Sequence, residues 1–190
     1  MIHKKFPAID QEWTLFLDRD GVLNVDNIHG YILNWDEFKF YDGVIDAMAI
    51  FSKLFSKIIL VTNQRGIGKG LMRTEDLEDI HQHMLAQINE GGGRMDLLLH
   101  CDSVLNDHPS RKPNPGMAFK AKELFPSIDF TRSIMVGNTG SDMEFGRNIG
   151  AYTVYIHTRK DKIPRPETVD AQFDNLLHLA KYLQSYNNEM

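Results

Sequence analysis

The sequence predicts an α/β fold in which helices cover a parallel sheet, and two features of the 190-residue chain predict it. Short apolar runs of strand length alternate with longer helical patterns, as in repeated βα units. The first run, residues 13–17, is almost wholly aromatic and aliphatic, which is typical of a strand buried on both faces of a sheet. A hydrophobic fraction of 42% is enough for one good core, so we expect a single domain over residues 1–190.

The expected elements follow from these patterns in chain order. Five strands are predicted, at residues 13–17, 57–61, 96–100, 133–136 and 153–156. Five helices are predicted, at residues 44–55, 74–89, 115–124, 141–149 and 173–182. Thr74 is expected to cap its helix with its hydroxyl, and three glycines that begin at Gly91 end that helix. Residues 25–40 are expected to form an excursion beside the first strand.

The composition of the chain restricts the cellular compartment and the binding partners that we expect. The net charge of −5 disfavours a general nucleic-acid binder, because phosphate backbones attract basic surfaces. Cys101 is the only cysteine, so no intrachain disulfide forms and a reducing compartment is the simplest inference. The longest apolar stretch, residues 44–61, is interrupted by charged side chains, and residues 1–12 lack the apolar core of a signal peptide. We expect a cytoplasmic monomer with no membrane contact.

Two carboxylates, Asp18 and Asp20, directly follow the first predicted strand. Ligands of open parallel sheets gather at the carboxyl ends of the strands, so both side chains stand where an active site forms. Gly21 lets the chain turn away sharply after them. An ordinary strand end followed by an Asp-Gly turn explains the same pattern, and the dipeptide alone leaves both interpretations open.

A second polar cluster follows the second predicted strand. Residues 62–64, Thr-Asn-Gln, lead into a glycine-rich basic loop that contains Arg65 and Lys69. Backbone amides and a cation in such a loop can hold a phosphate. The spacing departs from that of a nucleotide-binding P-loop, since Gly70 stands where a hydroxyl residue is expected. A flexible surface loop remains the alternative interpretation.

Two later clusters carry cations and acids. Arg111 and Lys112 lie in a loop that two prolines restrict before it enters the next helix. The last cluster, residues 137–142, comes directly after the fourth predicted strand. There Ser141 is expected to cap the following helix, with Asp142 favourably placed near the helix dipole. That capping role is compatible with a catalytic one.

Together these four clusters resemble the motifs of the haloacid dehalogenase (HAD) superfamily of phosphohydrolases, from about residue 16 to residue 155. Within it they are similar to the histidinol-phosphatase and D-glycero-D-manno-heptose-1,7-bisphosphate phosphatase branch. The matching segments are FLDRDGVLN at 16–24, VTNQ at 61–64 with GI at 66–67, and RKP at 111–113 with PGM at 115–117. The resemblance implies a three-layer Rossmann-like sheet with helices on both faces, little or no cap domain, and a dissociable Mg²⁺.

The resemblance also implies roles for individual residues. Asp18 would attack phosphorus and become an aspartyl-phosphate, while Asp20 would protonate the leaving alcohol and then deprotonate water. A carboxylate that approaches a phosphate dianion is repelled, so cations are required. The implied sets are catalytic Asp18, Asp20, Thr62 and Lys112; substrate-binding Thr62, Asn63, Arg65, Arg111 and Lys112; and magnesium-binding Asp18, Asp20, Asn138 and Asp142. Arg19 alternates away from the carboxylates in a strand-like geometry and receives no catalytic role.

Two positions depart from the family pattern. Asn138 stands where the family has an aspartate, so one charged metal ligand becomes a neutral carbonyl donor. Magnesium affinity should therefore fall unless Asp142 compensates. Many members of the branch carry a zinc loop, but between residues 101 and 111 this chain retains only Cys101 and His108 as plausible ligands. Two ligands are too few for an ordinary structural zinc site, so no zinc is expected.

The predicted function is hydrolysis of a small phosphorylated metabolite by a magnesium-dependent phosphatase. A sugar phosphate or bisphosphate such as D-glycero-D-manno-heptose 1,7-bisphosphate, or histidinol phosphate, is the expected substrate, with Arg65, Lys69 and Arg111 as candidates for a second phosphate. The Thr-Asn-Gln and Arg-Lys-Pro segments also resemble polynucleotide 3′-phosphatase domains, which the acidic balance makes a secondary reading. A third hypothesis is a phosphate-binding or regulatory protein that has lost turnover through Asn138.

Overall fold

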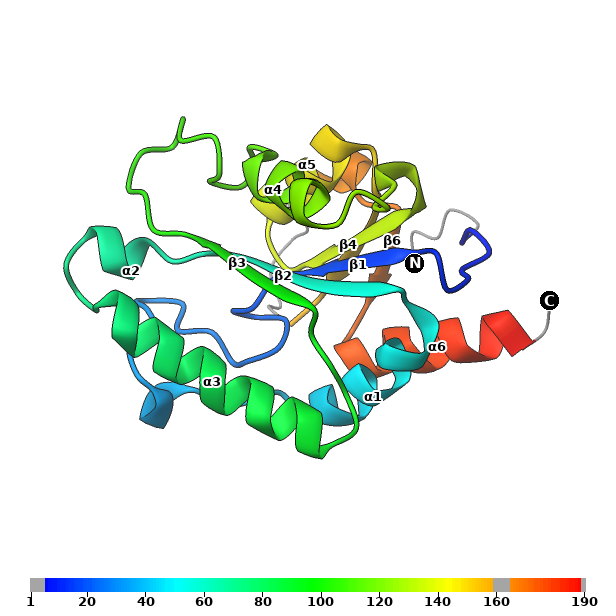
Figure 1. Ribbon diagram of the computed structural model, residues 1–190, viewed down its shortest axis with the longest axis horizontal. Coiled ribbons are helices and arrows are strands. Elements are labelled where there is room, and N and C mark those ends of the chain that lie inside the picture. The colour runs from blue at the N-terminus through cyan, green and yellow to red at the C-terminus, as the bar shows by residue number, and fades with distance from the viewer. Residues whose placement is uncertain (1–5, 159–164, 189–190) are drawn as a thin grey trace.

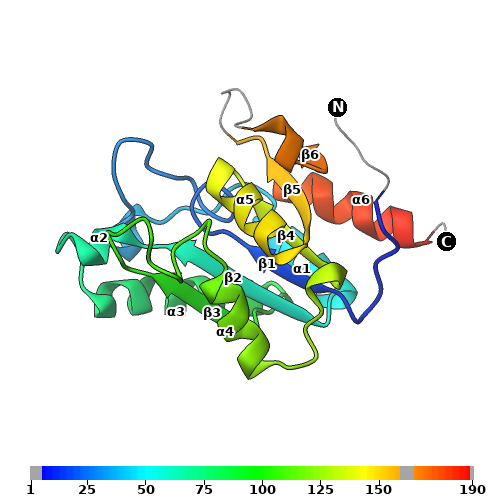
Figure 2. The same cartoon turned by 90° about the horizontal axis from the view of Figure 1, so that it is seen from above.

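A computed structural model describes residues 6–158 and 165–188, and it contains one six-stranded sheet between two layers of helices (Figures 1 and 2). The strand order is β3-β2-β1-β4-β5-β6. The strands are β1 (Thr14–Leu17), β2 (Lys57–Asn63), β3 (Leu97–Cys101), β4 (Ser133–Gly137), β5 (Tyr152–Ile156) and β6 (Ala171–Phe173). Every pair of neighbouring strands is parallel, so the predicted α/β class is confirmed.

Helices cover both faces of this sheet, as Figure 1 shows. One layer holds α1 (Val44–Leu54), α3 (Thr74–Glu90) and α6 (Leu176–Asn188), and the other holds α4 (Gly116–Leu124) and α5 (Gly140–Ile149). Leu15 and Leu17 of β1 pack into the core under the first layer, whereas Phe16 packs into the core under the second. Because side chains alternate along a strand, β1 must be apolar on both faces.

One predicted helix is wrong at its start. Residues 171–173 form the edge strand β6, in which Ala171 pairs with Val154 and Phe173 pairs with Ile156, and α6 begins only at Leu176. A strand of three residues is too short to show an alternating pattern, so its edge position depends on β5 and not on local sequence. The short helix α2 (Arg65–Gly68) occupies part of the predicted glycine-rich loop.

Both predicted hydroxyl caps are also wrong, and for one reason. Thr74 lies inside the first turn of α3, and the Asp76 carboxylate accepts a hydrogen bond from the main-chain nitrogen of Arg73 (2.8 Å). Thr139 rather than Ser141 caps α5, because Asp142 Oδ2 accepts from the main-chain nitrogen of Thr139 (2.9 Å). In each case an acidic residue three positions into the helix sets where the helix begins.

The excursion between β1 and α1 is small. It contains a single 3₁₀ turn, η1 (Trp35–Glu37), and isolated bridges that join Asn24 to Asp20 and to Phe40. No separate cap domain is therefore inserted at this point of the chain. None of the helices in residues 6–158 and 165–188 has the length and apolar character to cross a membrane.

The register of the central strands brings their carboxyl ends level. Leu17, the last residue of β1, pairs with Leu60 of β2 and with Val136 of β4. The residues that follow these partners therefore meet at one edge of the sheet. This edge carries the four polar clusters found in the sequence.

Candidate active site

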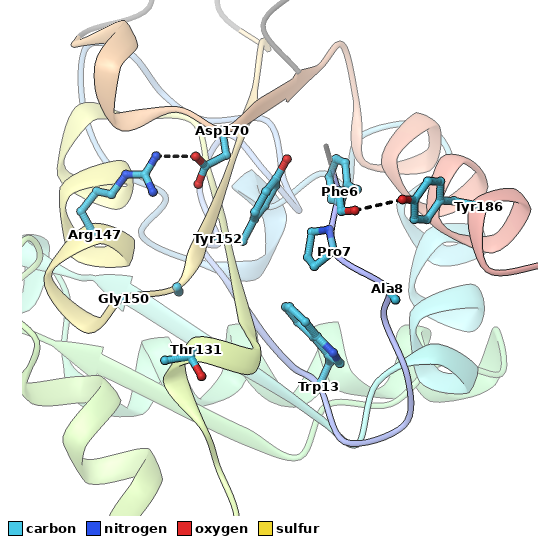
Figure 3. A pocket seen from close by; sticks show the side chains of 11 residues that line it. Phe6, Pro7, Ala8, Trp13, Thr131, Arg147, Gly150, Tyr152, Asp170 and Tyr186 are labelled. Carbon is cyan, nitrogen blue, oxygen red and sulfur yellow. Dashed lines mark hydrogen bonds and ion pairs between the residues drawn. The ribbon is translucent and has the colours of Figure 1, made fainter. Parts of the chain in front are cut away.

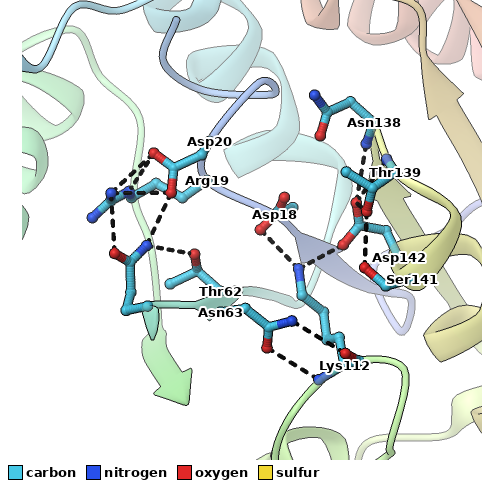
Figure 4. Close-up of polar contacts among 11 residues, drawn as sticks. Asp18, Arg19, Asp20, Thr62, Asn63, Lys112, Asn138, Thr139, Ser141 and Asp142 are labelled. Atoms are coloured by element: carbon cyan, nitrogen blue, oxygen red, sulfur yellow. Dashed lines mark hydrogen bonds and ion pairs between the residues drawn. The ribbon is translucent and has the colours of Figure 1, made fainter. Parts of the chain in front are cut away.

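A small pocket opens at the carboxyl edge of the sheet, where three neighbouring strands and one loop meet (Figure 4). Its volume is about 160 Å³. Its walls come from the ends of β1 and β2, the loop before α4, and the start of α5, and consist of Asp18, Asp20, Thr62, Asn63, Lys112, Thr139, Ser141 and Asp142. Most of the predicted catalytic and metal-binding residues thus lie side by side.

Lys112 is a buried cation between two acids. Its Nζ donates to Asp18 Oδ1 at 2.7 Å and to Asp142 Oδ1 at 2.6 Å, and the residue is only 3% exposed. The Asn63 amide holds the main chain of Lys112 from both sides, since it accepts from the Lys112 nitrogen and donates to the Lys112 oxygen, each at 3.1 Å. Asn63 therefore orients Lys112, and its predicted contact with substrate stays a prediction.

The charges in this chain of residues are unbalanced. Burial and, after it, the nearby Asp142 carboxylate raise the pKa of Asp18 to about 7, although the Lys112 ammonium opposes both effects. Burial alone would lower the pKa of Lys112, but Asp142 and Asp18 outweigh it and raise that pKa. One ammonium faces two carboxylates, so a further positive charge would favour the ionised form of Asp18.

Asp142 connects the helix cap to the pocket. While its Oδ1 faces Lys112, its Oδ2 accepts from Thr139 Oγ1 at 2.6 Å and from the main-chain nitrogen of Thr139 at 2.9 Å. The first turn of α5 therefore fixes the direction of this carboxylate. The predicted combination of a helix-start role with a place in the site is present, although Thr139 rather than Ser141 is the capping residue.

Asn138 lies next to the pocket, where its main-chain nitrogen donates to Asp142 Oδ2 at 3.2 Å. Its Nδ2 lies 3.5 Å from the Thr158 hydroxyl, which in turn donates to the carbonyl of Gly21 (2.7 Å). Asn138 Oδ1 is buried and, among the described residues, has no hydrogen-bond partner. Figure 4 shows this amide above Asp18, while the main-chain nitrogen of the same residue faces Asp142. A buried amide oxygen that no described residue bonds, on a residue whose main chain contacts Asp142, can join carboxylates in a donor set that suits Mg²⁺.

Asp20 lies beside Asp18 but turns toward a different set of partners (Figure 4). Arg19 Nη2 donates to both of its oxygens, at 2.9 and 3.0 Å, and the Asn24 amide donates to Oδ1 at 3.0 Å. Gln64 Nε2 donates to Asp20 Oδ2 at 2.9 Å. Burial opposes the charge of Asp20, but Arg19 and these hydrogen bonds outweigh it and lower the pKa of the carboxyl group.

Sequence reasoning missed the three residues that hold Asp20. Strand alternation placed Arg19 away from the carboxylates, yet the chain leaves β1 at Leu17 and the side chain of Arg19 folds back onto its neighbour. Gln64 and Asn24 stood inside recognised motifs without an assigned role. The signal that points to all three is the burial of polar side chains: Arg19 and Asn24 are 0% exposed and Gln64 is 3% exposed.

The structure does not bring the two predicted substrate-binding arginines into the pocket. Arg65 Nη2 donates to the Val104 carbonyl at 3.2 Å and to Asn106 Oδ1 at 2.6 Å. Arg111 Nη1 donates to the carbonyl of Ser103 at 3.2 Å. Both guanidinium groups thus support the loop of residues 102–110 beside the site, and their contact with substrate stays a prediction.

The same loop contains the residues considered for zinc. Cys101 Sγ lies 3.6 Å from His108 Nδ1. Within the described part of the chain, no three side chains of His, Cys, Asp or Glu converge in a metal-binding arrangement. The candidate metal ligands at the catalytic pocket are of a different kind, since they combine two carboxylates with an amide oxygen and a main-chain oxygen.

A larger hollow, of about 600 Å³, lies at the opposite edge of the sheet (Figure 3). Trp13 precedes β1 and Tyr152 begins β5, so this hollow faces the amino ends of the strands. Figure 3 shows aromatic side chains along its wall and Arg147 turned toward Asp170, its ion-pair partner at 2.6 Å. It lacks the paired acids and buried lysine of the smaller pocket, and chemistry rather than size therefore identifies the site.

A buried histidine behind the site leads to a pH prediction. His81 of α3 is 9% exposed, and burial, followed by the charge of Arg19, lowers its pKa from 6.5 to about 3. Below pH 6.5 the unfolded chain binds a proton at His81, whereas the folded chain does not bind it until near pH 3. The free energy of unfolding therefore decreases as the pH is lowered below 6.5. By pH 4.5 this amounts to about 2.7 kcal/mol.

The measurement is urea unfolding of the wild type and of His81→Gln between pH 7.5 and 4.5. Because the raised pKa of Asp18 acts in the opposite direction in both proteins, the readout is the difference in free energy of unfolding between them. We expect the wild type to lose stability relative to His81→Gln as pH falls. Replacement of Gln82, which is exposed on the same helix and does not titrate, is the matched control and should leave the difference from wild type constant.

Comparisons with known proteins agree on one class of enzyme. A model of the HAD-hydrolase-like family matches residues 109–179. The D-glycero-beta-D-manno-heptose-1,7-bisphosphate 7-phosphatase of Haemophilus influenzae is 36% identical over 182 residues, which cover 90% of this chain and 96% of that protein. The D-glycero-alpha-D-manno-heptose-1,7-bisphosphate 7-phosphatase of Mycobacterium bovis is 35% identical over 141 residues, or 74% of each protein.

A solved structure shares the whole fold. The D,D-heptose 1,7-bisphosphate phosphatase from B. bronchiseptica, crystallised with magnesium and phosphate, superimposes with a TM-score of 0.81 and 25% identity. The match covers 92% of this chain and 99% of that one. The likeness thus extends over nearly the whole of both chains.

Proposed function

Because this chain belongs to the HAD-like hydrolases and is a phosphatase, we propose that it removes a phosphoryl group from a sugar bisphosphate of the heptose 1,7-bisphosphate type. The observation that carries the proposal is the buried series Asp18–Lys112–Asp142 at the end of three parallel strands. A buried lysine between two acids has little value as a source of stability, because desolvation offsets most of the attraction. It has a clear use beside an anionic substrate.

In the proposed reaction, Asp18 Oδ attacks phosphorus, the bond to the sugar oxygen breaks, and an aspartyl-phosphate forms. Lys112 reduces the repulsion between this carboxylate and the phosphate, which is roughly 4 kcal/mol per pair of unit charges at 4 Å and an effective dielectric of 20. Thr62, which lines the pocket, would hold a phosphoryl oxygen with its hydroxyl. Asp20 would give a proton to the leaving alcohol and then take one from the water that hydrolyses the aspartyl-phosphate.

The oxygen donors of the pocket fit Mg²⁺. Asp18 and Asp142 would supply carboxylate oxygens, Asn138 its buried and unpartnered Oδ1, and Asp20 its main-chain carbonyl. When bound, the ion would add the positive charge that the two acids leave uncompensated, and so favour the ionised nucleophile and stabilise charge on phosphate. The raised pKa of Asp18 indicates the need for that charge.

A second small hollow, beside the catalytic pocket, is suited to bind the hydroxyl groups of a sugar leaving group. It has a volume of about 170 Å³ and shares Asp20 and Asn63 with the catalytic pocket. Its other walls include Asp26, Asn27 and Tyr31 from the excursion after β1. Carboxylate, amide and phenol groups suit the hydroxyls of a sugar better than another phosphate. The position of the second phosphate, assigned to Arg65, Lys69 or Arg111 in the sequence, stays a prediction.

Phosphate release from a panel of substrates tests the proposal. The panel holds both anomers of heptose 1,7-bisphosphate, histidinol phosphate, other sugar phosphates and a 3′-phosphorylated oligonucleotide, each with and without Mg²⁺. We expect Mg²⁺-dependent release that favours a heptose bisphosphate. Preference for the oligonucleotide, with a steep fall as salt is added, would contradict the sugar substrate. Tight phosphate binding without release at saturating Mg²⁺ would instead support the regulatory hypothesis.

Replacement of Asn138 by aspartate tests the metal assignment. The change adds a negative charge at the unpartnered oxygen, so we expect the Mg²⁺ concentration for half-maximal activity to fall roughly tenfold. The midpoint of thermal unfolding should also shift at lower Mg²⁺ when no substrate is present. Asn89→Asp, at the exposed end of α3, is the matched control. An unchanged Mg²⁺ dependence in Asn138→Asp would remove residue 138 from the metal site.

A further inference from the structure

Arg19 makes its charged contact with the acid that the proposed reaction needs most. The side chain is 0% exposed. Its Nε donates to Asp20 Oδ1 at 3.2 Å, and its Nη2 donates to Oδ1 at 2.9 Å and to Oδ2 at 3.0 Å. Among the described residues, Asp20 is the carboxylate that pairs with this guanidinium. A forked donor that meets both oxygens fixes the plane of a carboxylate as well as its position.

The same carboxylate belongs to a wider network that reaches the catalytic pocket. Gln64 Nε2 donates to Asp20 Oδ2 and to Thr62 Oγ1, at 2.9 Å in each case, and Arg19 Nη2 lies 3.4 Å from Gln64 Oε1. Asn24 holds the other oxygen of Asp20. Arg19 is the cation of this set, and it lines neither of the two pockets.

Asp20 itself stays accessible at the border of the two hollows. Its side chain is 29% exposed, and it lines both the catalytic pocket and the neighbouring hollow assigned to the leaving group. A proton donor for the leaving alcohol must stand at this border, because the breaking bond joins the phosphoryl group on one side to the alcohol on the other. The ion pair with Arg19 therefore determines where the acid stands.

We propose that Arg19 is a positioning residue that fixes the plane and place of the Asp20 carboxyl group at the border between the phosphoryl pocket and the leaving-group pocket, where its protonated form would face the leaving oxygen. The inference rests on the proposed function, because it assigns Asp20 the role of acid. Arg19 exchanges no proton and touches no substrate. Its removal should therefore harm the step that needs the acid, and spare the same step when no acid is needed.

The choice of leaving group separates these cases. A sugar alkoxide is a poor leaving group and requires a proton as the bond to phosphorus breaks, whereas p-nitrophenolate leaves without one. The ratio kcat/KM reports events up to the first irreversible step, so it isolates the loss of the alcohol from the later hydrolysis of aspartyl-phosphate. A purely structural role for Arg19 would lower kcat/KM for both substrates alike.

The experiment measures kcat/KM for heptose 1,7-bisphosphate and for p-nitrophenyl phosphate in Arg19→Met, Arg19→Lys and Asp20→Asn. We expect Arg19→Met to lose roughly tenfold to a hundredfold with the sugar substrate and less than about threefold with the aryl substrate. Arg19→Lys keeps the charge without the fork, so its loss should be intermediate, and it serves if Arg19→Met does not fold. Arg147→Met, which breaks the distant pair with Asp170, should leave the ratio between substrates unchanged.

Asp20→Asn separates failure of this inference from failure of the proposed function. If Asp20→Asn shows a loss confined to the sugar substrate and the Arg19 variants show equal losses or none, the positioning role is wrong and the acid role stands. If Asp20→Asn loses activity equally with both substrates, Asp20 is not the acid, and the acid role and the positioning role of Arg19 both fall; the proposed function falls only if the wild type does not release phosphate from heptose 1,7-bisphosphate. A selective loss in both sets of variants supports both.

Discussion

Replacement of Asp18 by asparagine is expected to lower kcat by roughly 10⁴-fold or more, because an amide cannot form the aspartyl-phosphate. The substitution keeps the volume and shape of the side chain, so the geometry of the pocket should survive. Lys112 retains its contact with Asp142 at 2.6 Å in the variant. The loss would therefore report the chemistry of the nucleophile rather than the collapse of the site.

The stability of Asp18→Asn gives the control for this reading. Burial, followed by the nearby Asp142 carboxylate, opposes the charge of Asp18 and raises its pKa to about 7, so the ionised side chain is costly to hold. Its neutral replacement should leave the midpoint of thermal unfolding unchanged or slightly higher. Acid quenching during turnover should trap phosphate on the wild-type chain and none on the variant. Activity that persists in Asp18→Asn would exclude Asp18 as the nucleophile.

The sequence predicts the central strands well because their length and their apolar composition both indicate a strand. The first five strands are confirmed within one or two residues of their bounds, since each is an apolar run, although the edge strand β3 is only partly buried. The edge strand β6 is missed because its three residues owe their conformation to pairing with β5. Local sequence does not encode that neighbour.

The residues of the candidate site also fall into those that the sequence predicts and those that it does not. Residues that contact the pocket, such as Asp18, Lys112 and Asp142, stand at strand ends in recognisable motifs and are brought together as expected. Arg19 was dismissed by an alternation rule that holds only inside a strand, and β1 ends two residues before it. The distances from Arg65 and Arg111 to the pocket depend on loop paths, which spacing in the sequence does not determine.

Replacement of Lys112 by methionine is expected to have two large effects. The first is a loss of roughly 10³-fold in kcat, because the phosphate then meets Asp18 and Asp142 without the buried ammonium. The second is a loss of roughly 3–5 kcal/mol in the free energy of unfolding, because two buried carboxylates lose their shared partner. Lys120→Met is the control, since the Lys120–Glu123 pair is exposed and should contribute little.

The pH dependence of that stability loss tests its cause. Without Lys112, the pKa of Asp18 should rise above its present value of about 7, while the unfolded chain keeps an ordinary carboxyl near 3.8. A group whose pKa is raised by folding loses stability as pH rises above the unfolded value, because the folded chain must either hold a proton or bury a charge. The gap between wild type and Lys112→Met should therefore be small at pH 5 and widen toward pH 8.

Added Mg²⁺ should narrow this gap at pH 8, because the ion would supply positive charge beside the same two carboxylates. Urea unfolding of both proteins at pH 5, 6, 7 and 8, with and without Mg²⁺, measures each effect. A gap that is constant across this range would mean that Lys112 stabilises the fold through packing of its methylene stem. In that case its charge would act only on the bound phosphate, and the balance among Asp18, Lys112 and Asp142 would have to be reconsidered.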